Sequence, residues 1–455
     1  MKNLTLEHIA RACGGTYIGA EDKKEACVDN ISTDSRQAGK GTLFVAIKGA
    51  RVDGHNFIPQ VAEQGALAAL SERELPDCPI PYIRVESTLQ AVKDIAEYYL
   101  EQLKIPVVGI TGSVGKTSTK EMIAAVLAQK YNVLKTLGNF NNELGLPLTV
   151  FRLREEHEIA VLEMGINHFG EMHRLAKIAK PDTCVITNIG YCHLENLIDR
   201  DGVLRAKTEI FDHMKTGGTA ILNGDDDKLA TVKEVHGRKA VYFGLNPENE
   251  IYADEIEPRG LKGISCRIHT AEGSFSVLVP IPGRHMVYNA LAGTAVGLQY
   301  GLTLEQIQKG IESLQSLSGR FHIIEANGMT IVDDCYNANP MSMKASLDVL
   351  KDALGRKVAI LGDMGELGEN EAALHAEVGK HAAHSGIDCL ICAGTLSEHM
   401  AQAAKEANPE LRVIRYAQRE ELVEHLKELV KPGDTVLVKA SHAMQFEKIV
   451  EALQK

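Results

Sequence analysis

The chain has 455 residues, of which 44% are hydrophobic and 24% are charged, and its net charge is −12. This length and composition predict a globular protein of about three domains. The acidic charge argues against a general nucleic-acid-binding protein, and the lack of a long apolar run argues against a membrane span. The nine cysteines have no regular spacing, which favours free thiols in a reducing compartment. We therefore expect a cytoplasmic protein.

Residues 1–84 are predicted to form a small α/β domain. The stretches "GTLFVAIKG" (41–49) and "PYIRVE" (81–86) have the apolar, β-branched character of strands. Two polar loops, "STDSR" (32–36) and "DGH" (53–55), accompany them. Taken alone, "STDSR" is typical of a loop with an Asx turn.

Residues 109–121 read "GITGSVGKTSTKE". A phosphate-binding P-loop reads G-x-x-x-x-G-K-[ST], and here Ile110 stands in place of the first glycine. The apolar run before the loop predicts a buried strand, and the apolar residues after it recur at helical spacing. Backbone N–H groups at such a strand–turn–helix junction point at an anion, Lys116 adds a positive charge, and Thr117 offers a hydroxyl to Mg²⁺. The alternative is a tight turn that contains G-K-T by chance.

From about residue 105 onward, short apolar strands alternate with helical stretches, from "PVVGI" (106–110) to "TVLVKAS" (435–441). Ligands of parallel α/β sheets lie beyond the carboxyl ends of the strands, so polar residues that end these strands are candidates for chemistry. The alternative is that polar residues simply end buried strands. The candidates are Glu163, Asn188, Asp225, Asp334, Asp363 and Lys439.

The pattern changes between about 240 and 282. "KAVYFG", "IYADEIEP", "GISCRIHT" and "SFSVLVPIPG" predict an antiparallel meander with turn residues between the strands. A break at "LSGRF" (317–321) precedes a second α/β block. The predicted domains are therefore 1–84, 85–315 and 316–455.

Several longer motifs resemble the Mur ligase family, in order and over nearly the whole chain. They include "STDSRQAGKGTLFVAIKGARVDGHNF" (32–57), "TLGNFNNELGLPLTV" (136–150), "EMGINHFGEM" (163–172), "DDCYNANP" (333–340) and "LGDMGELG" (361–368). The resemblance implies an α/β protein of three domains: a small UDP-binding domain, a central P-loop ATPase-like parallel sheet with an added antiparallel meander, and a Rossmann-like C-terminal domain that closes on ATP.

The resemblance also implies an activity, that of an ATP-dependent amide ligase working through an acyl phosphate. "DDCYNANP" together with "DMGELG" indicates the step that joins D-alanyl-D-alanine to UDP-N-acetylmuramoyl-tripeptide, giving a pentapeptide precursor of peptidoglycan, and we expect a monomer. The alternatives are another Mur ligase step, a folylpolyglutamate synthetase-like ligase, which typically lacks a UDP-binding domain, and a GTPase switch, against which the absence of an N-K-x-D motif argues.

The resemblance assigns ATP contacts to this chain. It implies that Asn289 reads the adenine, that Arg320 reaches the γ-phosphate, and that Asp334 accepts the ribose hydroxyls. Without the resemblance, each of these residues would be structural more often than not. The full set for ATP is Thr111, Gly112, Ser113, Val114, Gly115, Lys116, Thr117, Ser118, Asn289, Arg320 and Asp334.

The same resemblance implies two Mg²⁺ ions and a modified lysine. Lys207, in "AKTEIF", matches a lysine that is carbamylated by CO₂ in this family, which turns a cation into an anion able to hold a metal. From the sequence alone it would be an ordinary helix lysine. The implied metal ligands are Thr117, Glu163, His193 and Lys207, and the implied catalytic residues are Lys116, Lys207 and Arg320.

The substrate contacts are also implied by the resemblance. The residues of the two N-terminal loops would bind the UDP end, three residues of 136–142 would line the sugar-peptide channel, and two asparagines near 338 would meet the dipeptide. They are Thr33, Asp34, Ser35, Arg36, Asp53, Gly54 and His55, then Thr136, Asn139 and Asn142, then Asn337 and Asn339. In "VKASHAM" (438–444), many relatives carry Gly and Arg where this chain has Ala440 and His442, so no arginine contact is assigned there.

Overall fold

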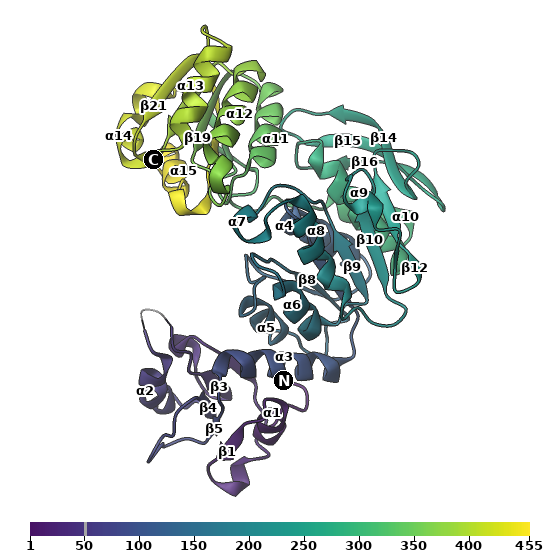
Figure 1. Cartoon of the computed structure of the whole chain (residues 1–455), viewed down its shortest axis with the longest axis vertical. Coiled ribbons are helices and arrows are strands. Elements are labelled where there is room, and N and C mark those ends of the chain that lie inside the picture. The colour runs from purple at the N-terminus through teal and green to yellow at the C-terminus, as the bar shows by residue number, and fades with distance from the viewer. Residues whose placement is uncertain (50–51) are drawn as a thin grey trace.

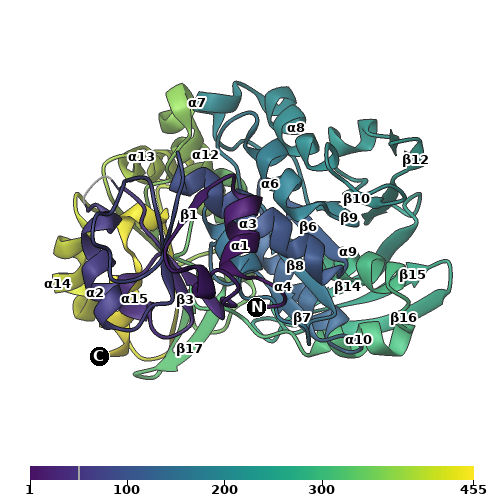
Figure 2. The same cartoon turned by 90° about the horizontal axis from the view of Figure 1, so that it is seen from below.

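The computed structural model describes residues 1–49 and 52–455. Three units follow one another along the long axis of the molecule, each built on one sheet (Figure 1). Seen from the N-terminal end, the first unit lies in front of the other two (Figure 2). Within the described residues, no helix is both long and apolar enough to cross a membrane.

The first unit holds a five-stranded sheet of order β1-β5-β4-β3-β2, in which only β1 is antiparallel to its neighbour. The two predicted strands of this unit are present, but three others were not predicted, because they are short and β4 is made mostly of alanine and leucine. The elements are α1 (Leu6–Ala12), β1 (Thr16–Ile18), β2 (Asn30–Ser32), β3 (Thr42–Val45), α2 (Ile58–Glu63), β4 (Ala68–Ser71) and β5 (Tyr82–Arg84).

Helix α3 (Thr88–Leu103) connects this unit to the central sheet. Its side chains pack against α1 and also against α5 (Gly145–Val150) and α6 (Glu171–Ala179) of the central unit. The Tyr99 hydroxyl donates to the carbonyl of Leu153 across 2.8 Å. Since α3 packs on both units, the domain boundary after residue 84 stays a prediction, as does the one after residue 315.

The central sheet has nine strands in the order β16-β15-β14-β13-β10-β9-β6-β8-β7. All neighbours from β7 to β14 are parallel, and β14, β15 and β16 are antiparallel. The strands are β6 (Val107–Thr111), β7 (Val133–Lys135), β8 (Ile159–Glu163), β9 (Thr183–Ile186), β10 (Thr219–Asn223), β13 (Val241–Gly244), β14 (Ile251–Pro258), β15 (Ile264–Thr270) and β16 (Gly273–Val279), with a separate hairpin of β11 (Glu234–Val235) and β12 (Arg238–Lys239).

The prediction that "KAVYFG" begins an antiparallel meander is wrong. The strand β13 in that stretch pairs in parallel with both β10 and β14. Residues 224–240 between β10 and β13 form a connection long enough to return the chain to the same end of the sheet, as parallel pairing requires. Alternation of apolar residues does not reveal strand direction, so the sequence pattern assigned β13 to the antiparallel meander instead of the parallel part of the sheet.

Helices cover the central sheet on both faces (Figures 1 and 2). The long helix α9 packs against α4 and is buried along most of its length, which its many alanines and glycines allow. The covering helices are α5 and α6, already described, with α4 (Lys116–Leu127), α8 (Arg200–Thr208), α9 (His285–Gln299) and α10 (Leu304–Glu312), while the short α7 (Leu194–Leu197) packs on α8.

The third unit has a six-stranded sheet of order β17-β18-β22-β19-β20-β21, with β17 antiparallel at one edge. The α/β prediction for this block is confirmed, but β17 and β21 were missed, the latter because Arg412 and Arg415 interrupt its apolar run. The elements are β17 (His322–Ala326), β18 (Met329–Asp333), α11 (Pro340–Lys351), β19 (Arg356–Gly362), α12 (Glu371–His384), β20 (Cys389–Ala393), α13 (Ser397–Ala407), β21 (Arg412–Tyr416), α14 (Arg419–Leu429), β22 (Asp434–Lys439) and α15 (Glu447–Gln454).

Candidate active site

The loop 112–115 joins β6 to α4, as the sequence predicted. Gly115 has φ +79° and comes directly before the helix, a backbone conformation that favours glycine. A side chain on Gly112 would collide with Thr187 of the neighbouring strand end. The Lys116 Nζ donates to the carbonyl of Gly112 across 2.9 Å, and burial lowers the pKa of this lysine. The loop therefore holds its N–H groups and its cation at one place, beyond the carboxyl end of β6.

A cavity of about 910 Å³ lies over this loop, and both the central and the third unit contribute to its wall. It combines residues that are more than 200 positions apart in the chain. Of the residues predicted for the site, Ser113, Val114, Gly115, Lys116, Thr117, Ser118, Asn139, Asn142, Glu163, His193, Asn289, Arg320, Asp334, Asn337 and Asn339 line it. Thr111, Gly112, Thr136, Lys207 and the seven residues of the N-terminal loops do not.

Glu163 at the end of β8 is the centre of the polar contacts in this cavity. Its Oε1 accepts from the Thr117 hydroxyl at 3.2 Å and from the Asn141 Nδ2 at 2.8 Å, and its backbone N–H donates to the Thr136 Oγ1 at 3.0 Å. Its Oε2 is buried and has no hydrogen-bond partner among the described residues. A buried carboxylate oxygen without a donor has unused capacity for a cation.

Arg320 extends from the third unit to the P-loop. Its Nη2 donates to the Thr117 Oγ1 across 3.1 Å, and its guanidinium lies 4.0 Å from the centre of the Tyr336 ring. The flat, stacked guanidinium is held in place by the ring and faces the threonine that follows the P-loop lysine. Arg320 thus lies beside the P-loop, and its contact with the γ-phosphate stays a prediction.

Two predicted ATP ligands are engaged by other protein groups. The Asp334 carboxylate accepts from the Lys439 Nζ at 2.6 Å, the Ser346 hydroxyl at 2.6 Å and the backbone N–H of Phe321 at 3.1 Å. Asn289 is buried, and its Oδ1 accepts from the Thr119 hydroxyl at 2.9 Å. Both side chains line the cavity, but their roles toward ribose and adenine stay predictions.

His193, predicted to bind metal, contacts the third unit. Its Nδ1 lies 2.7 Å from Glu366 Oε2, and this contact lowers the pKa of the glutamate. His193 itself adopts φ +51° just before α7. Across residues 1–49 and 52–455, no group of three or more His, Cys, Asp or Glu side chains converges as a metal site would require.

Lys207 lies in α8 and is buried. Burial lowers the pKa of its amine to about 8, and the nearby Lys116 contributes in the same direction. Among the described residues, its ammonium takes part in neither a hydrogen bond nor an ion pair. The prediction of an ordinary solvated helix lysine, which the sequence alone would have favoured, is therefore wrong.

The predicted UDP contacts lie in the first unit and have structural roles of their own. The Asp34 side chain caps the 3₁₀ turn Ser35–Gln37 and pairs with Arg36 at 2.7 Å, which lowers the pKa of Asp34 to about 2. Asp53 accepts from the His55 backbone N–H at 3.0 Å and lies 2.7 Å from its Nδ1. The Asx-turn alternative thus describes the backbone of "STDSR", and the substrate contacts of both loops, Thr33 and Gly54 included, stay predictions.

Two of the predicted asparagines accept hydrogen bonds from backbone N–H groups at the starts of helices. Asn142 Oδ1 accepts from the backbone N–H of Gly145 at 2.8 Å, and Asn339 is the N-cap of α11, where it accepts from the Ser342 N–H at 2.9 Å. Thr136 is fully buried rather than part of the channel wall. Asn139 and Asn337 remain on the cavity wall with Asn142 and Asn339.

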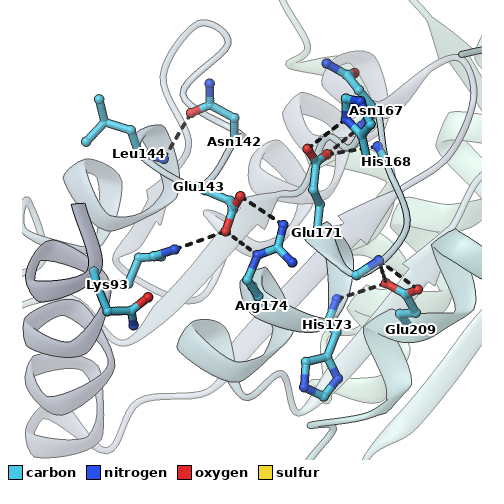
Figure 3. Close-up of polar contacts among 12 residues, drawn as sticks. Lys93, Asn142, Glu143, Leu144, Asn167, His168, Glu171, His173, Arg174 and Glu209 are labelled. Carbon is cyan, nitrogen blue, oxygen red and sulfur yellow. Dashed lines mark hydrogen bonds and ion pairs between the residues drawn. The ribbon is translucent and has the colours of Figure 1, made fainter. Parts of the chain in front are cut away.

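Sequence reasoning missed a group of charged residues at the cavity wall, whose contacts Figure 3 shows. Glu143 accepts from the Lys93 Nζ of α3 at 3.2 Å and from Arg174 of α6 at 2.5 and 3.1 Å. Next to them, Glu171 accepts from the backbone N–H of Asn167 at 2.7 Å. Lys93 lies on α3, Glu143 lies in the turn before α5, and Arg174 lies on α6, so only the tertiary fold brings these three together.

Asn141 and Lys120 were also missed. Asn141 stands between the two predicted asparagines of "NFNNELG" and was a visible candidate. Lys120 follows the P-loop in "TSTKE" and resembles a solvated helix lysine, yet it is fully buried. Lysine is almost never fully buried unless it is paired, and only the folded structure shows its partners.

Three family profiles match the chain in succession. The Mur ligase family, catalytic domain, matches residues 28–100, the Mur ligase middle domain matches 110–297, and the Mur ligase, glutamate ligase domain, matches 319–442. The UDP-N-acetylmuramoyl-tripeptide–D-alanyl-D-alanine ligase of Bacillus subtilis (strain 168) is 37% identical over 454 residues, which cover 99% of this chain and 98% of that protein.

Two solved structures are similar over most of the chain. A crystal structure of MurF from Acinetobacter baumannii is 35% identical, with a TM-score of 0.90 and 99% of each chain covered. The MurF ligase of Thermotoga maritima in complex with ADP is 31% identical, with a TM-score of 0.82 and coverage of 93% of this chain and 97% of that one.

Proposed function

The chain belongs to the Mur ligase family, and we propose that it joins D-alanyl-D-alanine to UDP-N-acetylmuramoyl-tripeptide at the expense of ATP. The names of its relatives support this step over the folylpolyglutamate synthetase-like alternative and over the other Mur ligase steps. The observation that carries the proposal is the meeting of Thr117, Glu163 and Arg320 over the P-loop, with the cavity wall built from two units.

The reaction has two steps. The terminal carboxylate of the UDP-linked tripeptide attacks the γ-phosphorus of ATP, which gives an acyl phosphate and ADP. The free amine of D-alanyl-D-alanine then attacks the acyl carbon, phosphate leaves, and the amine loses a proton as the amide forms. Phosphoryl transfer depends on positioning and on neutralising charge more than on covalent help from the protein.

The residues of the chain supply that positioning. The N–H groups at the start of α4 and the Lys116 ammonium face the phosphates of ATP. Arg320, held by the Tyr336 ring, stabilises charge that develops on the transferring phosphoryl group. Arg320 of the third unit already donates to the Thr117 Oγ1 across 3.1 Å, so its guanidinium lies beside the P-loop, and further closure of the units on substrate stays a prediction.

We propose that Thr117 and Glu163 hold one Mg²⁺, for which the unpartnered Oε2 of Glu163 is suited. The metal would offset the repulsion between the triphosphate and the substrate carboxylate. His193 and a carbamylated Lys207 would hold a second Mg²⁺, and this requires His193 to leave Glu366. Carbamate formation needs a neutral amine, and the lowered pKa of Lys207 supplies a larger neutral fraction than a solvated lysine would have.

The product would be the UDP-linked pentapeptide used in peptidoglycan synthesis. Since ATP and UDP-linked sugars are cytoplasmic compounds, we place the reaction in the cytoplasm, and we keep the expectation of a monomer, which sedimentation measurements would test.

An acceptor-selectivity assay tests the proposal. Purified protein is given ATP, Mg²⁺, UDP-N-acetylmuramoyl-tripeptide and either D-alanyl-D-alanine, L-alanyl-L-alanine or glutamate, and both amide formation and phosphate release are measured. We expect amide only with the D,D-dipeptide and phosphate release only when both substrates are present. Phosphate release without either substrate would indicate a nucleotide switch, and use of glutamate would indicate a folylpolyglutamate-type ligase.

A further inference from the structure

Lys120 is buried, charged and unused by the mechanism described above. It lies one helical turn after Lys116 in α4, and its side chain reaches the start of loop 136–142. The ammonium donates to the backbone carbonyl of Thr136 across 2.7 Å and pairs with Glu121 at 2.9 Å. A third oxygen, Glu163 Oε2, lies 3.9 Å from the same nitrogen.

These three oxygens connect two parts of the site. Thr136 begins the loop whose Asn139 and Asn142 line the cavity, and Glu163 is the proposed metal ligand. The loop is fastened to Glu163 from two sides, because Thr136 Oγ1 accepts from the Glu163 backbone and Asn141 Nδ2 donates to its carboxylate. Lys120 fixes the backbone at the point where this loop starts.

The distance between the Lys120 Nζ and the Glu163 Oε2 affects how this carboxylate oxygen is used. At 3.9 Å the contact is too long for a hydrogen bond, yet the positive charge still offsets the buried carboxylate. Glu163 Oε2 therefore keeps its lone pairs free. A neutral hydrogen-bond donor in place of Lys120 would either occupy the lone pairs of Glu163 Oε2 or, if it lay too far away, leave the negative charge of the carboxylate without a nearby positive charge.

We propose that Lys120 is a positioning residue of the ligase. Its buried ammonium holds loop 136–142 against Glu163, so that the sugar-peptide substrate is placed next to the carboxylate that binds metal. The inference rests on the proposed function, because it assigns that loop to the UDP-linked substrate. It predicts that loss of the ammonium affects the UDP-linked substrate and leaves nucleotide binding by the P-loop unchanged.

The test uses Lys120→Met, which keeps the length of the side chain and removes the charge. We expect the KM for UDP-N-acetylmuramoyl-tripeptide to rise about tenfold or more, because a buried hydrogen bond to a charged group is lost. The Kd for ADP measured by calorimetry without Mg²⁺ should change by less than about threefold, because no P-loop contact is lost. Amide hydrogen exchange in 137–142 should speed up while exchange in β6 and α4 stays as in the wild type.

Lys135→Met is the matched control. Lys135 also pairs with Glu121, but its side chain is 38% exposed, so its loss should change the KM by less than about twofold. If Lys120→Met does not fold, Glu121→Gln carries the test, since it weakens the contact that holds the ammonium and should raise the same KM by a smaller factor.

Two outcomes would overturn the inference. One is an unchanged KM and unchanged loop exchange in a folded Lys120→Met protein, or in Glu121→Gln where that variant is used. The other is an equal loss of ADP and UDP-peptide binding, which would make Lys120 a general stabiliser of α4. A wild-type protein that forms no amide would instead refute the proposed function, so the two failures are distinguishable.

Discussion

Two carboxylates face the same cavity from different sheets. Glu163 ends β8 of the central sheet, and Asp334 follows β18 of the third unit. Glu163 leaves one buried oxygen without a donor, whereas Asp334 accepts from Lys439, Ser346 and the Phe321 backbone. We propose that the central edge of the cavity receives a cation, whereas the Asp334 carboxylate is held by contacts within the third unit.

The largest effect is expected at the P-loop of the central edge. Lys116→Ala should reduce amide formation by on the order of a thousandfold, because a cation is removed from the transferring phosphates. Thermal unfolding should stay close to that of the wild type, since the Lys116 ammonium donates to the carbonyl of Gly112 within its own loop. Wild-type turnover by a folded Lys116→Ala protein would contradict the assignment of this loop as the binding site for the phosphates of ATP.

Lys207 adds a buried lysine to the comparison of the two carboxylates, because the proposed carbamate would turn its positive charge into a negative one. Lys207→Ala and Lys207→Arg should both lose at least about a hundredfold in activity. At 4 Å and an effective dielectric near 20, the interaction energy of each pair of unit charges is about 4 kcal/mol, so the sign of the charge at position 207 decides whether the metal binds. Short-chain carboxylic acids should restore part of the activity of Lys207→Ala. Full activity in Lys207→Arg would refute the carbamate.

The lowered pKa of Lys207 predicts a pH dependence with a definite sign. Between its folded pKa of about 8 and its ordinary value of 10.5, the unfolded chain binds more protons at this site than the folded chain does. The free energy of unfolding should therefore gain a positive slope as pH rises from 8 to 10.5. Denaturation measurements on Lys207→Met should show that slope reduced, and an identical slope in both proteins would show that the lysine is not desolvated.

Asp334→Asn should affect stability more than metal binding. The change leaves the buried Lys439 ammonium without its anion, and breaking such a pair costs about 3–5 kcal/mol. Chemical denaturation should show the loss in the transition of the third unit. If Asp334→Asn unfolds like the wild type, the carboxylate is not the structural group that its contacts indicate.

The smallest effect on stability is expected at the first unit. Arg36 is largely exposed and pairs with Asp34, so Arg36→Ala should change the free energy of unfolding by less than about 1 kcal/mol. If "STDSR" binds the UDP end, the same variant should raise the KM for the UDP-linked substrate. Lys24→Ala, which removes a half-buried lysine of this unit that pairs with Glu21, serves as the control and should leave that KM unchanged.

The sequence anticipated features that depend on local pattern. The strand–turn–helix of the P-loop, the α/β alternation and the polar residues at strand ends all follow from short stretches of the chain. The direction of β13 and the strand β21 were missed, because alternation does not encode direction and Arg412 and Arg415 mask an apolar run. The buried positions of Lys120 and Lys207 were also missed, because helix packing sets them.

Metal binding tests the contrast between the two carboxylates most directly. In this experiment Mn²⁺ replaces Mg²⁺ in the presence of ADP, and bound Mn²⁺ is measured by electron paramagnetic resonance. The wild type, Glu163→Gln and Asp334→Asn are compared at a temperature well below the unfolding temperature of each protein. We predict that Glu163→Gln weakens Mn²⁺ binding by about tenfold or more, whereas Asp334→Asn changes it by less than about threefold. Unchanged Mn²⁺ binding in Glu163→Gln, or a larger loss in Asp334→Asn, would contradict the assignment of the metal to the central edge of the cavity.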